Sequence, residues 1–427
     1  MFSYRLTRGL LTLALLGFGC GTDSTNPGIN SVSVNTTGVT VAPTNIQLRS
    51  GASQQFTAQA SSSDGRSGPI DQVANWASSN PAVAISSSGL ATAATVTAVV
   101  PATVSNITAT YGGITSNPAQ VRVLPPTGSL QKFTAGLAPA TFLQGCTTGP
   151  DGNIWFVADL PDAVGRISPS TGEITQFTTG LTPGGYPLDI TPGSDGNLWF
   201  CEAVGKRIGR ITPAGVITEF STGISPSATP LRVCLGPDGN VWFSAGDRLA
   251  KITPAGLVTE FTAGLTPGAD PLGICAGPDG NVWFTENFGN RIGRITPAGV
   301  ITEFSAGISP ASGPVSICAG PDGALWFIEQ AGNRVGRITT AGVVTEFSAG
   351  LTAGSLPFHI TSASDGNLWF TESVASKIGR ITPAGVITEF TNGLSPTSVP
   401  NWLTPGPDGN LWVTLTGGEN SLGVLVP

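Results

Sequence analysis

Apolar and polar residues alternate along short stretches from residue 129 to the C-terminus, and turns rich in glycine and proline separate these stretches. An alternation with a period of two is typical of a strand that buries one face. Seven tryptophans mark a recurrence of this pattern every 41 to 44 residues: Trp155, Trp199, Trp242, Trp283, Trp326, Trp369 and Trp412. A fixed period of this length indicates a repeat architecture.

One copy of the repeat, residues 271–304, shows what each unit contains. We expect four strands in it, at residues 271–276, 282–286, 291–296 and 300–304. The Asp-Gly and Pro-Ala-Gly sequences between strands favour tight hairpin turns. Seven units of four antiparallel strands predict an all-β fold, a seven-bladed β-propeller over residues 129–427.

The two ends of the repeat region are incomplete. Residues 129–133 match only the fourth strand of a copy, and residues 421–427 match only the third strand. We therefore predict that the first strand of the region completes the last blade. This pairing would join the ring and remove two open sheet edges.

Residues 31–124 have a different pattern, with strands expected at residues 31–34, 54–60, 74–77, 107–111 and 121–123. A unit of this length can bury a core of its own, and we place Trp76 in that core. Residues 125–128, Pro-Pro-Thr-Gly, are interpreted as a linker. The segment is similar to the bacterial Ig-like domains of surface proteins, which implies a β-sandwich that serves as a spacer or adhesive module.

The first residues have the features of an export signal. Arg5 and Arg8 precede an apolar run that is too short to span a bilayer, so residues 1–19 are interpreted as a signal peptide. The small residues before Cys20 resemble a bacterial lipobox, which implies lipidation of Cys20, with residues 20–30 as a tether. We expect a cell-envelope lipoprotein, at the outer membrane or cell surface, whose only membrane contact is the lipid. Cleavage by an ordinary signal peptidase is the alternative.

The charge of the chain argues against one class of partner. The formal net charge is −7 and no basic stripe occurs, so nucleic acid is not expected to bind.

Four of the six cysteines occupy one place in four copies of the repeat, where the other copies have threonine: Cys146, Cys234, Cys275 and Cys318. A site that accepts either residue needs a small side chain, so we expect free thiols in the core.

The repeat text Gly-Pro-Asp-Gly-Asn-Val-Trp-Phe-Thr-Glu, followed by Arg-Ile-Gly-Arg-Ile-Thr-Pro-Ala-Gly, resembles the virginiamycin B lyase (streptogramin B lyase) family over the whole of residues 129–427. The resemblance implies a seven-bladed propeller. It also implies an elimination that opens a cyclic depsipeptide at an ester C–O bond, with a histidine base near the channel mouth. A divalent metal held partly by glutamates would assist the reaction.

The residues at the implied catalytic positions differ from that family. The glutamate and the histidine base would flank the first-strand proline of the last copy, where this chain has Val399 and Asn401. A second glutamate would lie four residues after the last repeat tryptophan, where this chain has Thr416. A further histidine is replaced by Phe358, and the only histidine of the chain, His359, follows it.

One position of the repeat has a different residue type in every copy, while the residue before it is mostly aliphatic. It lies two residues after the first-strand proline in six copies, and it is occupied by Gln144, Asp189, Arg232, Gly273, Ser316, His359 and Trp402. Because a strand alternates its faces and the first strand is innermost, we expect these side chains, with Asn401, to rim the central channel and bind a ligand. The alternative is that these residues differ only because packing is loose at a rim in contact with water.

The hairpin spacing adds a candidate catalytic pair. His359 and Glu372 are equidistant from the turn between the first two strands, which predicts that they face each other as base and orienting carboxylate. By the same count Asp189 faces Glu202. Carboxylates gathered at one mouth could hold Mg²⁺ or Ca²⁺. The alternative is that each glutamate is a repeat feature bonded within its own blade.

These observations favour an exported, lipid-anchored protein without catalytic activity, whose propeller mouth binds a small molecule, a peptide or a surface partner. A metal-dependent C–O lyase that opens cyclic depsipeptides of the streptogramin B type is the second hypothesis. A structural or adhesive module is the third.

Overall fold

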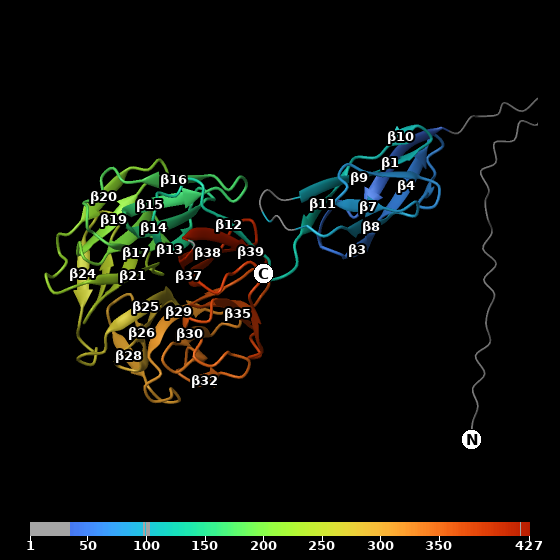
Figure 1. The fold of residues 1–427 in the computed structure, drawn as a ribbon. Helices are drawn as coiled ribbons and strands as arrows, with labels where there is room; N and C mark the ends of the chain where they lie inside the picture. The colour runs from blue at the N-terminus through green and yellow to red at the C-terminus, as the bar shows by residue number, and fades with distance from the viewer. Residues whose placement is uncertain (1–34, 97–98, 100–102, 419) are drawn as a thin grey trace, which may run out of the picture.

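The computed structural model describes residues 35–96, 99, 103–418 and 420–427. The regular elements in these residues are all β-strands, and none of the residues forms a helix long and apolar enough to cross a membrane. Figure 1 shows the strands gathered in two bodies, one from the N-terminal part of the chain and one from the remainder. The predicted signal peptide, Cys20, the tether and the strand at residues 31–34 lie outside the described residues.

The N-terminal body contains three small sheets within the described residues, in the orders β1-β4-β5, β10-β9-β11-β2 with β6 beside β9, and β3-β8-β7. Its strands are β1 (Thr36–Ala42), β2 (Asn45–Arg49), β3 (Ser53–Gln55), β4 (Thr57–Ser62), β5 (Ser67–Pro69), β6 (Asn75–Ser78), β7 (Val83–Ile85), β8 (Leu90–Ala93), β9 (Thr103–Tyr111), β10 (Ile114–Thr115) and β11 (Ala119–Leu124).

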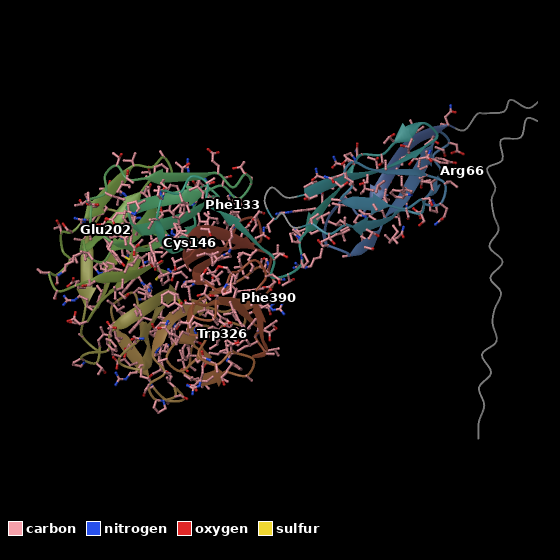
Figure 2. All side chains as sticks on the ribbon, viewed as in Figure 1. Arg66, Phe133, Cys146, Glu202, Trp326 and Phe390 are labelled. Atoms are coloured by element: carbon pink, nitrogen blue, oxygen red, sulfur yellow. The ribbon has the colours of Figure 1, made fainter. Side chains whose placement is uncertain are left out.

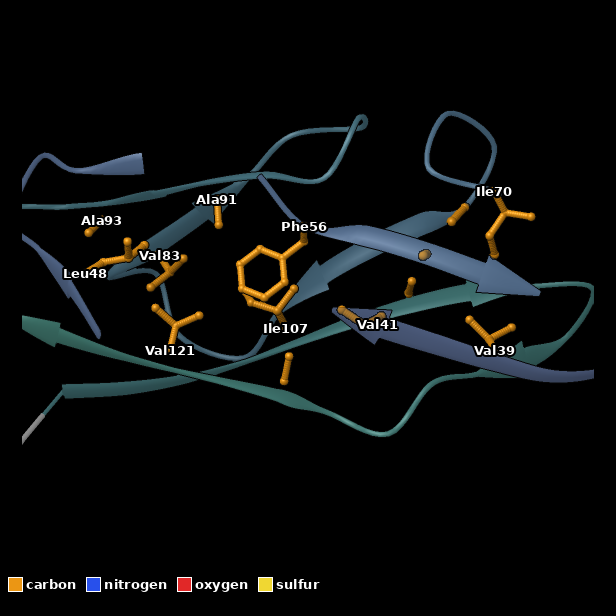
Figure 3. Packing of buried hydrophobic residues seen from close by; sticks show 14 of the residues in the cluster. Val39, Val41, Leu48, Phe56, Ile70, Val83, Ala91, Ala93, Ile107 and Val121 are labelled. Atoms are coloured by element: carbon orange, nitrogen blue, oxygen red, sulfur yellow. The ribbon is translucent and has the colours of Figure 1, made fainter. Parts of the chain in front are cut away.

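One apolar core holds this body together. Figure 3 shows Phe56 at its centre, close to Ile107 and Val121, and all three side chains are fully buried. The strand expected at residues 54–60 is divided at Phe56, whose N–H donates to the carbonyl of Gly89. Trp76 packs against the core and donates its indole N–H to the Asp71 carbonyl at 3.0 Å, as its predicted core position requires.

The second body consists of seven four-stranded antiparallel sheets in the described residues. Sheets 1 to 3 are formed by β13 (Phe142–Thr148), β14 (Ile154–Leu160), β15 (Asp162–Ile167) and β16 (Ile174–Phe177); β17 (Pro187–Pro192), β18 (Leu198–Glu202), β19 (Arg207–Ile211) and β20 (Ile217–Phe220); and β21 (Pro230–Leu235), β22 (Val241–Ala245), β23 (Leu249–Ile252) and β24 (Val258–Phe261).

Sheets 4 to 6 repeat the same order. They are formed by β25 (Pro271–Ala276), β26 (Val282–Glu286), β27 (Arg291–Ile295) and β28 (Ile301–Phe304); β29 (Pro314–Ala319), β30 (Leu325–Glu329), β31 (Arg334–Ile338) and β32 (Val344–Phe347); and β33 (Pro357–Ser362), β34 (Leu368–Glu372), β35 (Lys377–Ile381) and β36 (Ile387–Phe390). Sheet 7 combines β37 (Ser398–Pro405), β38 (Leu411–Gly417) and β39 (Ser421–Leu425) with β12 (Leu130–Phe133).

The innermost strand of each sheet contacts the innermost strands of its neighbours, and β13 contacts both β17 and β37. The sheets therefore form a closed ring around a common centre, which is the arrangement of a β-propeller. The predicted closure is present, because β12 pairs with β39 and places Leu130 opposite Leu425. Figure 2 shows Phe133 of β12 against the last sheet, where its ring stacks on Trp412 at 5.7 Å.

Each sheet is organised around its tryptophan. In sheet 4 the Trp283 indole N–H donates to the Asp279 carboxylate at 3.0 Å, and the same carboxylate accepts the backbone N–H of Asn281. The Trp283 ring stacks on Phe304 at 5.4 Å, and the Arg294 guanidinium lies 5.6 Å from the same ring. The aspartates of the Asp-Gly turns thus form turns, as predicted, and also fix the buried indole.

The cysteines of the ring are free thiols, as predicted. Among the described residues Cys146, Cys201 and Cys234 are buried, while Cys275 and Cys318 are half-buried. Burial raises their pKa values well above that of an exposed thiol, so these groups stay protonated and unreactive near neutral pH.

A prediction follows from the cross-strand pair of Phe327 and Gly336 in sheet 5. A Cβ at Gly336 would lie 2.1 Å from Cζ of the fully buried Phe327 ring. Gly336→Ala should therefore destabilise the propeller by about 1–3 kcal/mol, measured by denaturant unfolding. Gly68→Ala is the control, because nothing lies within 4 Å of its added Cβ. Equal stability of the two variants would contradict this packing.

Candidate functional site

The side chains predicted to rim the channel are largely covered by protein. Gln144, Asp189, Ser316 and Trp402 are buried, and the remaining members, Arg232, His359 and Asn401, are half-buried. The row therefore does not form an open polar rim.

Several members of the row bond the next sheet of the ring. Asp189 accepts the backbone N–H of Val233 at 3.0 Å. The Ser316 hydroxyl accepts the N–H of Ile360 at 3.3 Å, and Nδ1 of His359 accepts the N–H of Leu403 at 3.3 Å. Each donor lies 44 residues after its acceptor, on the innermost strand of the following sheet. Any side chain with a well-placed acceptor can make this link, so an aspartate, a serine and a histidine serve the same role in three copies.

Other members of the row fill the centre of the ring. The guanidinium of Arg232 lies 4.5 Å from the Trp402 ring and 5.9 Å from the Phe358 ring. Arg232 belongs to sheet 3, whereas Trp402 and Phe358 belong to sheets 7 and 6, which are not its neighbours. The arginine therefore reaches across the channel and closes it at this level with cation–π contacts.

Burial and the nearby charge of Arg232 keep the His359 ring neutral. Burial, and then the charge of Arg232, lower the pKa of His359 to about 3. Because Nδ1 accepts the Leu403 N–H, the single proton of the neutral ring lies on Nε2. Burial raises the pKa of Asp189 to about 6, although Arg232 opposes the shift. His359 consequently has no free lone pair with which to remove a proton from a substrate.

The predicted pairing of His359 with Glu372 is wrong. Glu372 lies opposite Pro357, two residues before the expected partner. One residue of the difference arises at the turn, because Ser362 pairs with Leu368 and the hairpin is centred on Asp365, and the other arises from a bulge between Pro357 and Ile360. For the same reason Glu202 lies opposite Pro187 instead of Asp189.

The glutamates that end the second strand of four sheets are enclosed within their own sheets. The Glu202 carboxylate contacts the Arg207 guanidinium at 2.7 Å, and Arg207 also contacts Glu219 on the fourth strand at 3.4 Å. Equivalent clusters surround Glu286, Glu329 and Glu372, and all four glutamates are fully buried. No group of three or more acidic, histidine or cysteine side chains suited to a metal ion occurs in the part of the chain that the structure describes.

The positions at which a catalytic metal and base are implied carry other residues with other contacts. Asn401 donates to the Leu143 carbonyl and to Oε1 of Gln144, both at 3.2 Å. The Thr416 hydroxyl donates to the Val399 carbonyl at 3.3 Å. An amide, a hydroxyl and an isopropyl group do not supply the carboxylate ligands that a divalent ion requires, so the residues present do not fit a Mg²⁺ or Ca²⁺ centre.

A cavity of about 470 Å³ lies between sheet 1 and the loop that leads to sheet 2. It is lined by Asp159, Leu160, Pro161, Asp162, Thr178, Leu181, Pro183, Gly184 and Tyr186. Asp159 is 1% exposed, its Oδ2 accepts Gln144 Nε2 at 2.8 Å, and its Oδ1 has no hydrogen-bond partner. A volume of this size is typical of a small-molecule site.

The local sequence of sheet 1 builds this cavity. Its second and third strands are joined through Pro161 alone, whereas the corresponding strands of sheet 4 are joined by residues 287–290. Asp162 accepts the backbone N–H of Gly185 at 2.8 Å and thereby holds the loop beneath Tyr186. Contact with Asp159, followed by burial, raises the pKa of the Tyr186 phenol, although no hydrogen bond of normal geometry joins the two side chains.

Sequence reasoning did not single out Asp159 or Tyr186, although a signal was present. Tyr186 is the only tyrosine of residues 129–427, and sheet 1 has Ala158-Asp159 where four other copies have a glutamate and a neutral residue. The positive φ of Tyr186, 61°, is shared by Asp270 and Leu356 at the same place in their copies. The repeat thus fixes the backbone conformation at this position, while the type of side chain differs among the copies.

The ring and its repeat define the class of the molecule, which is a β-propeller. Comparison of the sequence with family models shows that the chain belongs to the virginiamycin B lyase family, whose model matches residues 129–350 and 308–425. A comparison with curated protein sequences gave no significant match.

Solved structures agree with the family. A streptogramin B lyase structure is 34% identical, with a TM-score of 0.64 over 69% of this chain and 96% of the other. Virginiamycin B lyase from Staphylococcus aureus is 36% identical, with a TM-score of 0.64 over 70% and 99% of the two chains. A catalytically inactive histidine-to-alanine variant of the latter, with quinupristin, matches equally well.

The buried glutamates predict how the stability of the propeller depends on pH. Burial, together with a neighbouring glutamate, raises the pKa values of Glu202, Glu286 and Glu372 to about 7 and that of Glu329 to about 8. A carboxyl whose folded pKa is raised stabilises the fold below its ordinary pKa and loses that contribution as pH rises through the folded pKa. The melting temperature should therefore fall as the pH rises from about 5 to about 8.

The variant that tests this pH dependence is Glu329→Gln, because its amide has the shape of a protonated carboxyl and stays neutral at every pH. Its melting temperature should fall less steeply over the same range, when both proteins are scanned in buffers of equal ionic strength. A wild-type profile that is flat or rises over this range would show that these carboxyls are already ionised in the folded protein.

Proposed function

We propose that this protein is an exported surface protein, anchored by a lipid on Cys20, whose seven-bladed propeller binds a small organic ligand in the cavity beside the channel mouth. Residues 31–124 serve as an Ig-like spacer between the anchor and the propeller. The observation that carries the proposal is the cavity of about 470 Å³ between sheet 1 and the loop to sheet 2, whose lining includes Asp159, Asp162, Tyr186 and several apolar side chains.

The state of the only histidine supports binding without the elimination reaction. His359 is held between sheets with both ring nitrogens committed, one as an acceptor and one as an N–H, and Arg232 disfavours a second proton. Neither Asn401 nor Thr416 can replace a general base with a pKa near neutrality. These contacts support a function in binding without proton abstraction at the position that the family implies.

A C–O lyase acting on cyclic depsipeptides is the second candidate. Family membership favours it, and so does the similarity to a virginiamycin B lyase structure that contains quinupristin. In that case a residue other than His359 would have to remove the proton, because the His359 lone pair is occupied.

The two candidates differ in what happens to quinupristin. We expect the purified protein with Mg²⁺ to leave it cyclic, because the His359 lone pair is occupied and Asn401 and Thr416 are not general bases. Elimination would open the ring without changing its mass, so the measurement is chromatographic retention combined with mass spectrometry, and a product of unchanged mass at a new retention time would establish the lyase. His359→Ala is the accompanying variant, and we expect it to lower the melting temperature through loss of the link to Leu403.

A further inference from the structure

The loop of residues 178–186, which joins sheet 1 to sheet 2 and lines the cavity, is attached to its surroundings at two points. Thr182 donates its backbone N–H to Oε1 of Glu219 and its hydroxyl to Oε2 of the same carboxylate, both at 2.6 Å. The Gly185 N–H donates to Asp162 at 2.8 Å. These attachments fix the position of one wall of the cavity.

A second glutamate lies against the same loop. Glu202 of β18 is fully buried, and its Oε2 would be 2.6 Å from a Cβ added at Gly185, so the loop backbone packs directly on this carboxyl. Arg207 of β19 contacts both acids, at 2.7 Å from Glu202 and 3.4 Å from Glu219. Two carboxyls and one guanidinium therefore occupy a space that the loop covers.

The two acids lose their protons in different pH ranges. Burial, opposed by Arg207 and assisted by Glu219, raises the pKa of Glu202 to about 7. Burial also disfavours ionisation of Glu219, but the Thr182 hydrogen bonds, and then Glu202 and Arg207, lower its pKa. The phenol of Tyr186 in the loop is neutral throughout. Below pH 7 the group thus has one negative and one positive charge, and above pH 7 it gains a second negative charge.

Charged side chains of the neighbouring strands are directed elsewhere. Asp189 of β17 and Arg232 of β21 lie beside Cys201, the residue before Glu202 on β18. Because successive residues of a strand point to opposite faces, these two groups are on the other face of the sheet. The Lys206 ammonium donates to a backbone carbonyl of the following loop. The second negative charge therefore has Arg207 as its partner, which already contacts Glu219.

The same arrangement occurs in sheets 4, 5 and 6. The buried acid is Glu286, Glu329 or Glu372, and the outer acid, Glu303, Glu346 or Glu389, accepts the N–H and the hydroxyl of Thr266, Ser309 or Thr352 in the preceding loop.

Sheet 3 differs at one point. Ala245 takes the place of the buried acid, whereas Glu260 still accepts the Ser225 N–H at 2.8 Å and pairs with Arg248 at 2.7 Å. The loop of residues 221–229 therefore has the attachment without the titrating acid, and it provides a comparison within the same chain.

We propose that protonated Glu202 keeps the loop of residues 178–186 closed on the cavity, and that loss of this proton releases Thr182 from Glu219 and opens the cavity wall. Two ionised carboxylates repel each other in an enclosed space. Glu219 is the one that moves, because it lies on the outermost strand with 13% of its side chain exposed, while Glu202 is enclosed. Opening of the loop requires no ligand, and only its effect on binding in the cavity rests on the proposed function.

Hydrogen exchange of the full chain, measured by mass spectrometry of its peptides at pH 6 and pH 8, tests the proposal. Rates are corrected for the intrinsic pH dependence of amide exchange. Peptides that contain Thr182, Thr266, Ser309 or Thr352 should lose protection by about 10-fold, because opening is linked to the release of one proton whose pKa is near 7 in the closed state. The peptide that contains Ser225 should keep its protection.

Glu202→Gln is the variant for this test, because its amide is neutral at both pH values. The peptide that contains Thr182 should lose its pH response, while the loops before sheets 4, 5 and 6 should respond as in the wild type and thereby show that the ring is folded. The comparison of the five loops in the wild type needs no variant, so the proposal is testable even if Glu202→Gln fails to fold.

Two results would overturn the proposal. The first is an equal response, or none, in all five loops, which would show that no buried acid controls an individual loop. The second is an unchanged pH response at Thr182 in Glu202→Gln, which would assign the response to another group. Because the experiment contains no ligand, a failure of the cavity to bind one would refute the proposed function and leave this result unaffected.

Discussion

The bond between each buried tryptophan and the aspartate of its turn is the interaction on which the ring depends. A four-stranded sheet has two apolar faces and cannot bury them alone, so it must pack between neighbours. The Trp283 indole, held by Asp279 and stacked on Phe304, is a large rigid body that fixes the position of its sheet relative to the next one. Because this contact recurs in every copy, the shape of each sheet is set away from the channel, and the residue types near the channel can diverge.

That freedom explains which parts of the molecule could be predicted from its sequence. The repeat period, the hairpin turns and the closure of the ring follow from local patterns, and the strands of sheet 4 begin and end within one residue of their expected positions. The facing pairs of the channel row could not be predicted, because the hairpin turn is centred on Asp365, which shifts the pairing by one residue, and a bulge between Pro357 and Ile360 adds a second shift. A bulge of this kind leaves the apolar alternation of the remaining strand intact, and so it leaves no trace in the pattern.

The cavity shows a second limit of prediction from the pattern. Variation at Gln144, Asp189 and His359 was interpreted as a sign of ligand contact, yet Asp189 and His359 bond the following sheet. Gln144 is the member of the row that contributes to the candidate site, and it does so through Asp159, on a neighbouring strand. Variation among copies therefore identifies positions where the repeat does not require one residue type. The contacts in the structure then show whether such a residue packs against a neighbouring sheet or lies near a ligand site.

Buried acidic side chains occur in two settings in the ring, paired with an arginine or held by a neutral group. In sheets 2, 4 and 5 an acid enters the interior with an arginine, and the pair belongs to the structure of its own sheet. In sheet 1 the arginine position is Ala163, and the acid at Asp159 is held by a neutral amide while its second oxygen is buried. The acid of sheet 6, Glu372, is also buried without an ion pair to a described residue, because Lys377 opposite it pairs with Glu389 instead. The fold therefore accepts a buried acid without a countercharge, since burial raises the pKa of Glu372 to about 7 and favours its neutral form.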